Sequence, residues 1–328
     1  MGFLCKAVQS ENMKPTKYYS SIFLRFISYD RFLFRFADRE EALNPPSDLL
    51  ERVRNCMIYL ICIRPIITIV PESFEHHEDF CQFDIKYRIN DTEHRKSVKT
   101  PKGLIKDFGG KVEVSKFPHT SIHFYDKDDN LVVNMLISNF VHLLEGTPEE
   151  VSNHEILYIG KGTADCAVDR LNGHTTLEKI LADVLRDEPN KEVVILIYNF
   201  EIKKSVISNS KIGQSAEIRG DAAKKHFIKV AEYKPTIDEQ TKIAEALLID
   251  YFSTSKYNTH FSGGLFLKAG IFDNIRDADF DALVVELNNE NIGCLNLFSN
   301  KISPNYFHHA WLDIRKLEGR ISVFDPTK

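Results

Sequence analysis

The chain has 328 residues, of which 43% are hydrophobic and 27% are charged, and its formal net charge is -5. This length is enough for two or three domains, and the composition is that of a globular protein rather than a disordered or fibrous one. The acidic balance excludes a general electrostatic attraction to nucleic acid, so any such contact must come from a local basic surface.

The cysteines indicate a reducing environment. All six are scattered, without a Cys-x-x-Cys pair: Cys5, Cys56, Cys62, Cys81, Cys166 and Cys294. This pattern favours free thiols over disulfides or a zinc site. The first twenty residues lack the apolar core of a signal peptide, and the most apolar run, residues 57–70, is too short to span a bilayer. We therefore expect a cytoplasmic or nucleoid-associated protein without a membrane contact, in which residues 57–70 are buried core.

The first predicted element is aromatic and basic. Residues 21–36 interleave aromatic side chains with three arginines. They could form a surface that stacks bases and contacts phosphates. A β-hairpin turning at residues 28–30 is the favoured interpretation, because period-two alternation is typical of a half-buried strand.

A helix is predicted next. Ser47 or Asp48 can cap it, and apolar residues at helical spacing extend it to Met57. Arg64-Pro65 ends or kinks this helix, because proline disfavours helical backbone before it. Residues 66–70 are then predicted to form a β-branched strand.

Three features complete the N-terminal region, which we expect to span residues 1–130. Residues 75–81 contain His, Glu, Asp and Cys, but a solvated loop is favoured over a metal site because adjacent side chains point in different directions. Residues 86–106 are locally basic and fit either a phosphate-contacting surface or a solvated loop. Residues 112–133 are predicted to form two strands around a polar turn at 126–130.

The stretch richest in chemistry follows. Residues 156–159 form a short apolar run, as expected of a buried strand, and it breaks at Gly160-Lys161-Gly162, where glycine permits a tight turn. A helix is predicted from about residue 165 to 186. On it, Arg170 and His174 are four residues apart and would share one face. Fixed cations with a phenol or imidazole suit phosphate chemistry.

Residues 192–200 form a near-continuous apolar run, which predicts a central strand covered on both faces. Residues 203–229 are locally basic and are predicted to contain one helix. Within them, Lys224 and Lys225 are candidates for phosphate-backbone contacts, although an ordinary charged helix face explains them equally well.

The last predicted helix carries a carboxylate among apolar residues. Thr236 or Asp238 can cap this helix, which runs to about Phe252. Glu245 lies in its apolar middle, where a carboxylate is costly unless it is paired or binds a cation. Beyond it, residues 266–328 are predicted to be β-rich, with a hairpin over 282–299 and a final strand over 320–324.

The run Tyr-Ile-Gly-Lys-Gly-x7-Arg-Leu-Asn-Gly-His at residues 158–174 resembles the signature of the GIY-YIG nuclease superfamily. Glu245 in its apolar helix and Asn258 shortly after it continue the resemblance. The Gly-Lys-Gly turn and Gly263-Gly264 are most similar to the branch that contains the LEM-domain nucleases. The resemblance covers roughly residues 136–265.

The resemblance implies an α+β fold. A small antiparallel sheet flanked by helices would occupy residues 131–265, with a mixed N-terminal region over 1–130 and a β-rich extension over 266–328. It also implies a divalent-metal-dependent endonuclease that hydrolyses phosphodiester bonds in DNA with Mg²⁺ or Mn²⁺. The sequence leaves open whether the protein is a monomer or a homodimer.

The resemblance also implies roles for single residues. Glu245 would bind the metal, and Tyr158 or His142 would activate the attacking water. Arg170 would clamp the scissile phosphate. Lys161 would lower the pKa of the base or contact the phosphate, and His174 would orient the group beside it or the phosphate. The candidates for binding substrate are Lys161, Gly162, Asn258, Lys224 and Lys225.

One signature is missing at its expected place. No Gly-Ile-Tyr triplet lies just before the Tyr-Ile-Gly strand, and residues 139–144 are the best candidate strand, with His142 where the family has tyrosine. A histidine can act as a base near neutral pH. His142 could equally be a core-edge histidine, which would leave Tyr158 alone. The missing tyrosine also supports a second hypothesis, a catalytically degenerate nucleic-acid-binding or assembly module.

Overall fold

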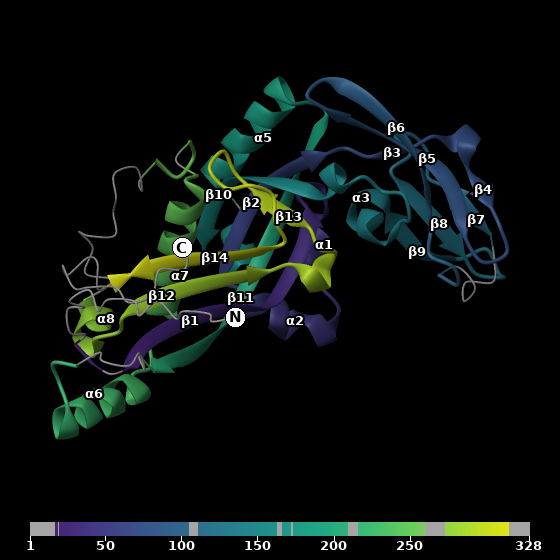
Figure 1. Ribbon diagram of the computed structural model, residues 1–328. Helices are drawn as coiled ribbons and strands as arrows, with labels where there is room; N and C mark the ends of the chain where they lie inside the picture. Colours follow the sequence, from purple (N-terminus) through teal and green to yellow (C-terminus); the bar gives the residue numbers. More distant parts are fainter. Residues whose placement is uncertain are drawn as a thin grey trace, which may run out of the picture.

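The computed structural model describes residues 17–18, 20–104, 111–162, 166–171, 173–208, 216–254, 256–259 and 273–314 (Figure 1). Its largest element is a seven-stranded mixed sheet with the order β13-β10-β2-β11-β1-β12-β14. The strands of this sheet are β1 (Ser20–Arg35), β2 (Ile58–Pro65), β10 (Asn153–Lys161), β11 (Lys191–Ser208), β12 (Ala282–Asn288), β13 (Asn296–Phe298) and β14 (Phe307–Asp313).

Eight α-helices are found in the described part of the chain: α1 (Arg39–Leu43), α2 (Ser47–Arg54), α3 (Ile137–Phe140), α4 (Ala167–Arg170), α5 (Thr175–Asp187), α6 (Gly220–Glu232), α7 (Ile237–Phe252) and α8 (Asp273–Ala278). None of them combines the length and the apolar character needed to cross a membrane. Helix α7 covers one face of the large sheet, whereas α2, α4 and α5 cover the other.

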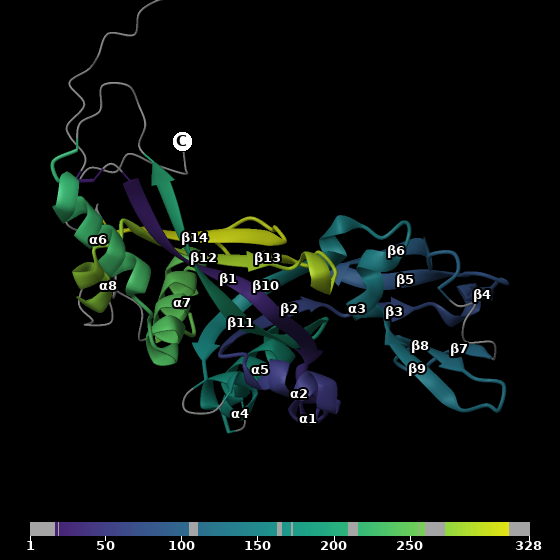
Figure 2. The ribbon, with the colours of Figure 1, turned by 90° about the horizontal axis from the view of Figure 1, so that it is seen from below.

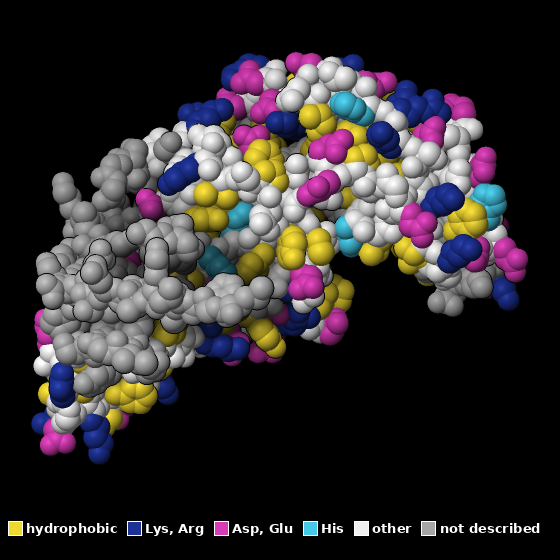
Figure 3. All heavy atoms as spheres, viewed as in Figure 1, with side chains coloured by type: hydrophobic (Ala, Val, Ile, Leu, Met, Phe, Trp, Pro, Cys, Tyr) yellow, Lys and Arg dark blue, Asp and Glu magenta, His cyan; other side chains and the backbone are white. Residues whose placement is uncertain are grey.

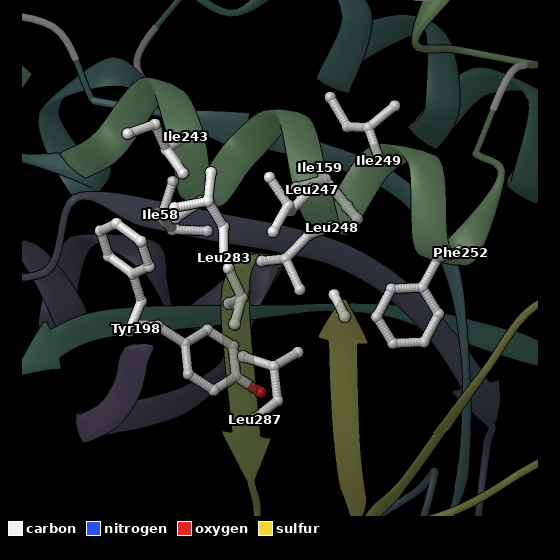
Figure 4. Packing of buried hydrophobic residues seen from close by; sticks show 14 of the residues in the cluster. Ile58, Ile159, Tyr198, Ile243, Leu247, Leu248, Ile249, Phe252, Leu283 and Leu287 are labelled. Atoms are coloured by element: carbon white, nitrogen blue, oxygen red, sulfur yellow. The ribbon is translucent and has the colours of Figure 1, made fainter. Parts of the chain in front are cut away.

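The face under α7 holds the larger core. The helix is capped by Thr236, one of the two predicted caps, which forms a capping box with Glu239. Its apolar side chains pack on alternate residues of the strands, such as Ile58 of β2 and Tyr198 of β11 (Figure 4). Because side chains of a strand alternate between faces, Tyr59 must point to the opposite side of β2.

The opposite face buries a second core under α2, α4 and α5. Tyr59, Ile61 and Ile63 of β2 contribute to it, together with alternate residues of β11. Every residue of β2 is buried, because helices cover both faces of the strand. The long apolar run of the sequence is therefore buried, as predicted.

A separate lobe lies between β2 and β10 in the sequence and at one end of the molecule (Figures 1 and 2). It consists of two small sheets around its own core. Its strands are β3 (Thr68–Ile69), β4 (Glu75–His76), β5 (Cys81–Ile89), β6 (Thr92–Lys99), β7 (Val112–Val114), β8 (Ser121–Tyr125) and β9 (Leu131–Leu136). The two strands predicted around the turn at 126–130 are β8 and β9.

The buried guanidinium of Arg64 joins this lobe to the large sheet. Its Nε donates to Glu192 Oε1 of β11 at 2.7 Å. Its two terminal nitrogens donate to the backbone oxygen and hydroxyl of Ser138, both at 2.9 Å, and to Asn139 Oδ1 at 2.6 Å. These hydrogen bonds of Arg64 thus fix the inserted lobe against the large sheet.

The N-terminal elements differ from two of the predictions. Residues 20–35 form one long strand rather than a hairpin, and its pairing with β11 shifts register between Ser28 and Arg31, at the predicted turn. Helix α2 ends at Arg54, so Ile58–Pro65 is a strand and not the end of that helix. An apolar run of eight residues has no periodicity that separates the two structures.

The predicted helix over residues 165–186 is divided. Helix α4 ends at Arg170, and His174 is the N-cap of α5. The predicted hairpin over 282–299 is also wrong, since β12 pairs with β1 and β14, whereas β13 pairs with β10. The strand predicted over 320–324 and the glycines Gly263 and Gly264 lie outside the described residues.

The α+β class is correct, but the sheet is large rather than small. The expected boundary near residue 130 is not a boundary of this sheet. Strands β1 and β2 come from the predicted N-terminal region, and β12, β13 and β14 come from the predicted C-terminal extension. Pairing between segments far apart in sequence built one sheet from all three regions.

Candidate active site

The candidate site is built around the antiparallel pair of β2 and β10. Tyr59 of β2 lies directly opposite Gly160 of β10. A Cβ atom on Gly160 would lie 2.4 Å from Cζ of Tyr59 and 2.7 Å from Cε1 of Tyr158, far inside van der Waals contact. Only glycine allows the two tyrosine rings to approach the backbone this closely. Their ring centroids are 6.0 Å apart.

A hydrogen-bonded chain links the two tyrosines to His174. The Nδ1 atom of His174 accepts the backbone N–H of Leu177 at 3.0 Å, so a neutral imidazole carries its proton on Nε2. This Nε2 lies 2.9 Å from the hydroxyl of Tyr59, which is therefore the acceptor. The hydroxyl of Tyr59 in turn hydrogen-bonds that of Tyr158. The donors thus point from His174 through Tyr59 to Tyr158.

The surroundings act on the pKa values of both phenols. Burial raises the pKa of Tyr59, and its hydrogen bond to Tyr158 raises it further. Burial is also the main reason why the pKa of Tyr158 is raised, and the negative charge of Glu245 adds to it. The charge of Arg170 lowers the pKa of both phenols, but the bond from Tyr59 lowers the pKa of Tyr158 alone. Tyr158 is therefore better placed than Tyr59 to lose a proton.

Arg170 is the exposed cation of the site. It ends α4, and in the described part of the chain no carboxylate pairs with it. Its charge lowers the pKa of Tyr158 and of His174, so its guanidinium acts on the same cluster. The prediction that Arg170 and His174 share a helix face is wrong, because a turn separates α4 from α5. The turn nevertheless keeps both residues beside the tyrosines.

Glu245 and Lys161 form the other half of the site. Glu245 lies in the buried middle of α7 with 9% of its surface exposed. Its nearest cation is Lys161, whose Nζ is 3.9 Å from Oε2 of Glu245, too far for a hydrogen bond. Burial raises the pKa of Glu245 to about 7, and the attraction of Lys161 opposes that shift only in part. The carboxylate is thus buried without a hydrogen-bond donor among the described residues.

Asn258 closes the open edge of β10. Its Oδ1 accepts the backbone N–H of Ile159 at 3.1 Å, and its Nδ2 donates to the backbone oxygen of Ile159 at 2.7 Å. The hydroxyl of Thr254 donates to the same Oδ1 at 2.8 Å. The amide therefore replaces a neighbouring strand and fixes the backbone between Tyr158 and Gly160. This arrangement favours a positioning role for Asn258 over the predicted contact with substrate.

The other predicted residues have different places. Gly162 is buried, and its N–H donates to the backbone oxygen of Met57 at 2.7 Å, so it joins β10 to the start of β2. Lys224 and Lys225 are exposed on α6, at the end of the molecule opposite the lobe (Figures 1 and 2). No hydrogen bond or ion pair links them to the site residues described above.

His142 does not occupy the place of the missing tyrosine. Residues 139–144, predicted as a strand, lie in α3 and in the short 3-10 helix Val141–Leu143. The imidazole of His142 packs on Gly293, where an added Cβ would lie 2.4 Å from Nδ1. Burial lowers its pKa. The strand that pairs antiparallel with β10 is β2, and its tyrosine is Tyr59.

Sequence reasoning missed Tyr59 because the lobe separates it from Tyr158 by almost a third of the chain. The available signal was the Ile-Tyr dipeptide at the start of an apolar run, residues 58–65. This run has the length of a buried strand. The partner strand of Tyr-Ile-Gly is therefore found only when the search is not limited to the residues just before it.

The basic and acidic stretches of the lobe are less distinctive. In the predicted basic surface, Lys86 pairs with Glu93 at 3.7 Å and Arg95 with Asp84 at 2.6 Å. Figure 3 shows Lys, Arg, Asp and Glu side chains interspersed on the visible face of the lobe. Within the described ranges, no group of three or more His, Cys, Asp or Glu side chains could hold a metal ion. The cluster at 75–81 is thus not such a group.

Comparison with known proteins adds nothing to this geometry: no family model, no curated protein and no solved structure matches the chain.

Proposed function

We propose that the protein is a divalent-metal-dependent endonuclease that hydrolyses phosphodiester bonds in DNA through a GIY-YIG-like site. The observation that carries this proposal is the antiparallel order β10-β2-β11, in which an Ile-Tyr strand lies beside the Tyr-Ile-Gly strand. Around this pair, the chain gathers two phenols, an imidazole, two cations and a buried carboxylate. These are the groups that phosphoryl chemistry uses.

The residues present fit one hard cation. Glu245 is a buried carboxylate with no hydrogen-bond donor, and its pKa is raised to about 7 by burial, so a nearby positive charge is needed to keep it ionised. Mg²⁺ commonly binds through one or two carboxylates and keeps several waters. A site with Glu245 as its single protein ligand has this character, and Mn²⁺ would serve equally. When bound, the ion would neutralise charge on the phosphoryl and leaving oxygens.

The other residues have separate tasks in this proposal. Tyr158 takes a proton from the attacking water, and the donors arriving from His174 and Tyr59 stabilise its phenolate. Arg170, exposed and unpaired with any described carboxylate, binds the scissile phosphate. Lys161 contacts the same phosphate from the side of Glu245. Asn258 and Gly160 hold the strand that carries Tyr158.

The alternative, a degenerate binding or assembly module, loses its main argument. That hypothesis depended on the absence of a tyrosine on the first signature strand, and Tyr59 now supplies one. A module that only binds has no need for a buried carboxylate that no described residue hydrogen-bonds, because such a group costs stability.

The test is cleavage of plasmid and branched DNA by the purified protein, with Mg²⁺ or Mn²⁺ and with chelator. We expect metal-dependent cutting that Glu245→Gln abolishes and that Asp250→Asn, an exposed carboxylate on the same helix, retains. Binding of DNA in the presence of chelator should be similar in all three proteins. Tight binding by the wild type without cutting of any substrate would refute the nuclease and favour the binding module.

A further inference from the structure

A polar hollow adjoins the candidate site and has no role in the chemistry described above. It lies where α2, the start of β2, the middle of β11 and the first half of α7 meet. Its volume is about 170 Å³, and it is open to solvent. Its lining residues are Arg54, Asn55, Met57, Ile58, Tyr198, Asn199, Phe200, Ile237, Gln240, Thr241 and Ala244.

The hollow is lined by neighbours of Lys161 and Glu245, although neither of these two residues lines it. On α7, Ala244 is the neighbour of Glu245 in sequence, and Thr241 lies one turn before it on the same face of the helix. On the sheet, Ile58 is the residue paired with Lys161. A substrate held at Lys161 therefore has its next chemical group within reach of this hollow.

The lining has the chemistry of a nucleotide site. Arg54 is exposed in the last turn of α2, and in the described part of the chain no carboxylate pairs with it. Phe200 is half-buried, and Ile237 is 66% exposed, so each offers an apolar surface to a flat ring. The side-chain amide of Asn55 is exposed and can meet the edge of a base. The amide nitrogens of Asn199 and Gln240 already donate to Asp30 Oδ2 and to the backbone oxygen of Pro235, so these residues offer chiefly their amide oxygens as acceptors.

We propose that this hollow binds the nucleotide next to the scissile phosphodiester, with Arg54 on its phosphate and its base between Phe200 and Ile237. This inference rests on the proposed function, because it takes the strand at Lys161 to be nucleic acid. It assigns the hollow to substrate positioning, apart from the residues that activate water or bind the cation.

The test separates binding from cleavage. Binding of a fluorescent DNA duplex with a single-stranded tail is measured in chelator, where no metal-dependent cutting takes place, for the wild type and Arg54→Ala. Arg186→Ala is the matched control, since it is also an exposed arginine in the last turn of a helix. A second variant, Ile237→Asp, tests the apolar wall at an exposed position.

We expect Arg54→Ala to weaken binding roughly tenfold and to lower the dependence of log Kd on log salt by about one. Ile237→Asp should weaken binding in the same way, and Arg186→Ala should not. In cleavage assays with Mg²⁺, Arg54→Ala should raise KM and leave kcat nearly unchanged. Binding by Arg54→Ala and Ile237→Asp equal to that of Arg186→Ala would overturn the inference.

The two proposals can fail separately. If the wild type never cuts DNA with any metal, the proposed function fails, and the binding comparison in chelator still decides the role of the hollow. If the wild type cuts and all three variants bind and cut alike, the nuclease stands and the hollow has no part in holding substrate.

Discussion

Two buried charged residues lie near opposite ends of the β2–β10 pair, and they differ in how well they are hydrogen-bonded. Arg64 is 1% exposed, and its guanidinium makes four hydrogen bonds, one of them to Glu192. Glu245 is 9% exposed, and its closest cation, Lys161, stays 3.9 Å away. A buried charge that is well hydrogen-bonded stabilises the structure, whereas a buried charge without hydrogen-bond donors is a candidate for binding a ligand. Beside one strand pair, Arg64 therefore stabilises the structure, whereas Glu245 is suited to bind a ligand.

The largest expected effect is a loss of stability when Arg64 is replaced. Arg64→Leu leaves Glu192, Ser138 and Asn139 without their donor, so we expect the free energy of unfolding to fall by about 3–5 kcal/mol. Urea denaturation measures it. Arg186→Leu, which loses only exposed ion pairs, should change stability by less than about 1 kcal/mol. Equal losses in both variants would contradict the anchoring role.

The next effect concerns the exposed cation at the other end. Arg170→Ala should lower the cleavage rate by about 10²–10³-fold, the typical result of removing one charge-stabilising donor. Its stability should hardly change, because Arg170 is exposed and pairs with no described carboxylate. Single-turnover kinetics with circular dichroism as a folding check would measure both. A rate within twofold of the wild type would exclude the phosphate clamp.

Gly160→Ala tests the close approach of the tyrosines. The new methyl group would lie 2.4 Å from the ring of Tyr59, so the ring must move and its bond to His174 must lengthen. Overpacking of this kind costs about 1–3 kcal/mol, and we expect a loss of activity beyond what that instability explains. Thermal unfolding and cleavage at a temperature where the variant is folded separate the two. Unchanged activity in a folded variant would show that Tyr59 is not needed.

His154, on β10, is intermediate between Arg64 and Glu245 in how well it is hydrogen-bonded. Its Nδ1 bonds the backbone oxygen of Ser152, but its buried Nε2 has no hydrogen-bond partner among the residues that the structure describes. Burial, with a contribution from Arg64, lowers its pKa to about 3. The unfolded chain, with a histidine pKa of about 6.5, therefore binds more protons than the folded protein between these values.

This shift makes stability depend on pH in a defined window. The contribution of His154 is fully present above pH of about 6.5 and is lost as the pH falls toward 3. Between pH 7.5 and 5.5 the loss is about 1 kcal/mol for this one residue. Chemical denaturation of wild type and His154→Leu at both pH values measures it, and the variant should lose less. The same pH dependence in both proteins would contradict the shift.

The smallest effect concerns the carboxylate of Glu245. In chelator, Glu245→Leu should keep its stability or gain up to about 1 kcal/mol, because an apolar side chain removes a buried carboxyl group that has no hydrogen-bond donor among the described residues. Differential scanning calorimetry compares it with the wild type. A loss above 2 kcal/mol would mean that Glu245 is an anchor like Arg64, and the contrast between the two charges would disappear.

Local signals in the sequence predicted part of the fold correctly. The capping box and apolar pattern of α7 and the apolar run of β11 identified both elements, because such signals depend on neighbouring residues. The position of β2 beside β10 could not be derived, since strand pairing across an inserted lobe leaves no local mark. The break at Arg170 was missed because a histidine is an unusual N-cap.

The residues of the candidate site were predicted more completely than the strand pairing that holds them. Six predicted residues lie around the carboxyl end of β10: Tyr158, Lys161, Arg170, His174, Glu245 and Asn258. Motif spacing within residues 158–174 was sufficient for the first four, whereas Glu245 and Asn258 were predicted from the apolar helix and the resemblance downstream. Tyr59 and the exclusion of His142 required the three-dimensional pairing of strands.

The inserted lobe also affects the stage of folding at which the candidate site can form. Ile63 pairs with Glu155, so β2 and β10 form a hairpin whose connecting loop is an entire lobe. Pairs separated by so much chain form late in folding, and a chain ending before β10 carries Tyr59 without Tyr158. The two tyrosines therefore belong to separable halves. A break within the lobe would yield two fragments, each inert alone, whose reunion would restore both tyrosines to one strand pair.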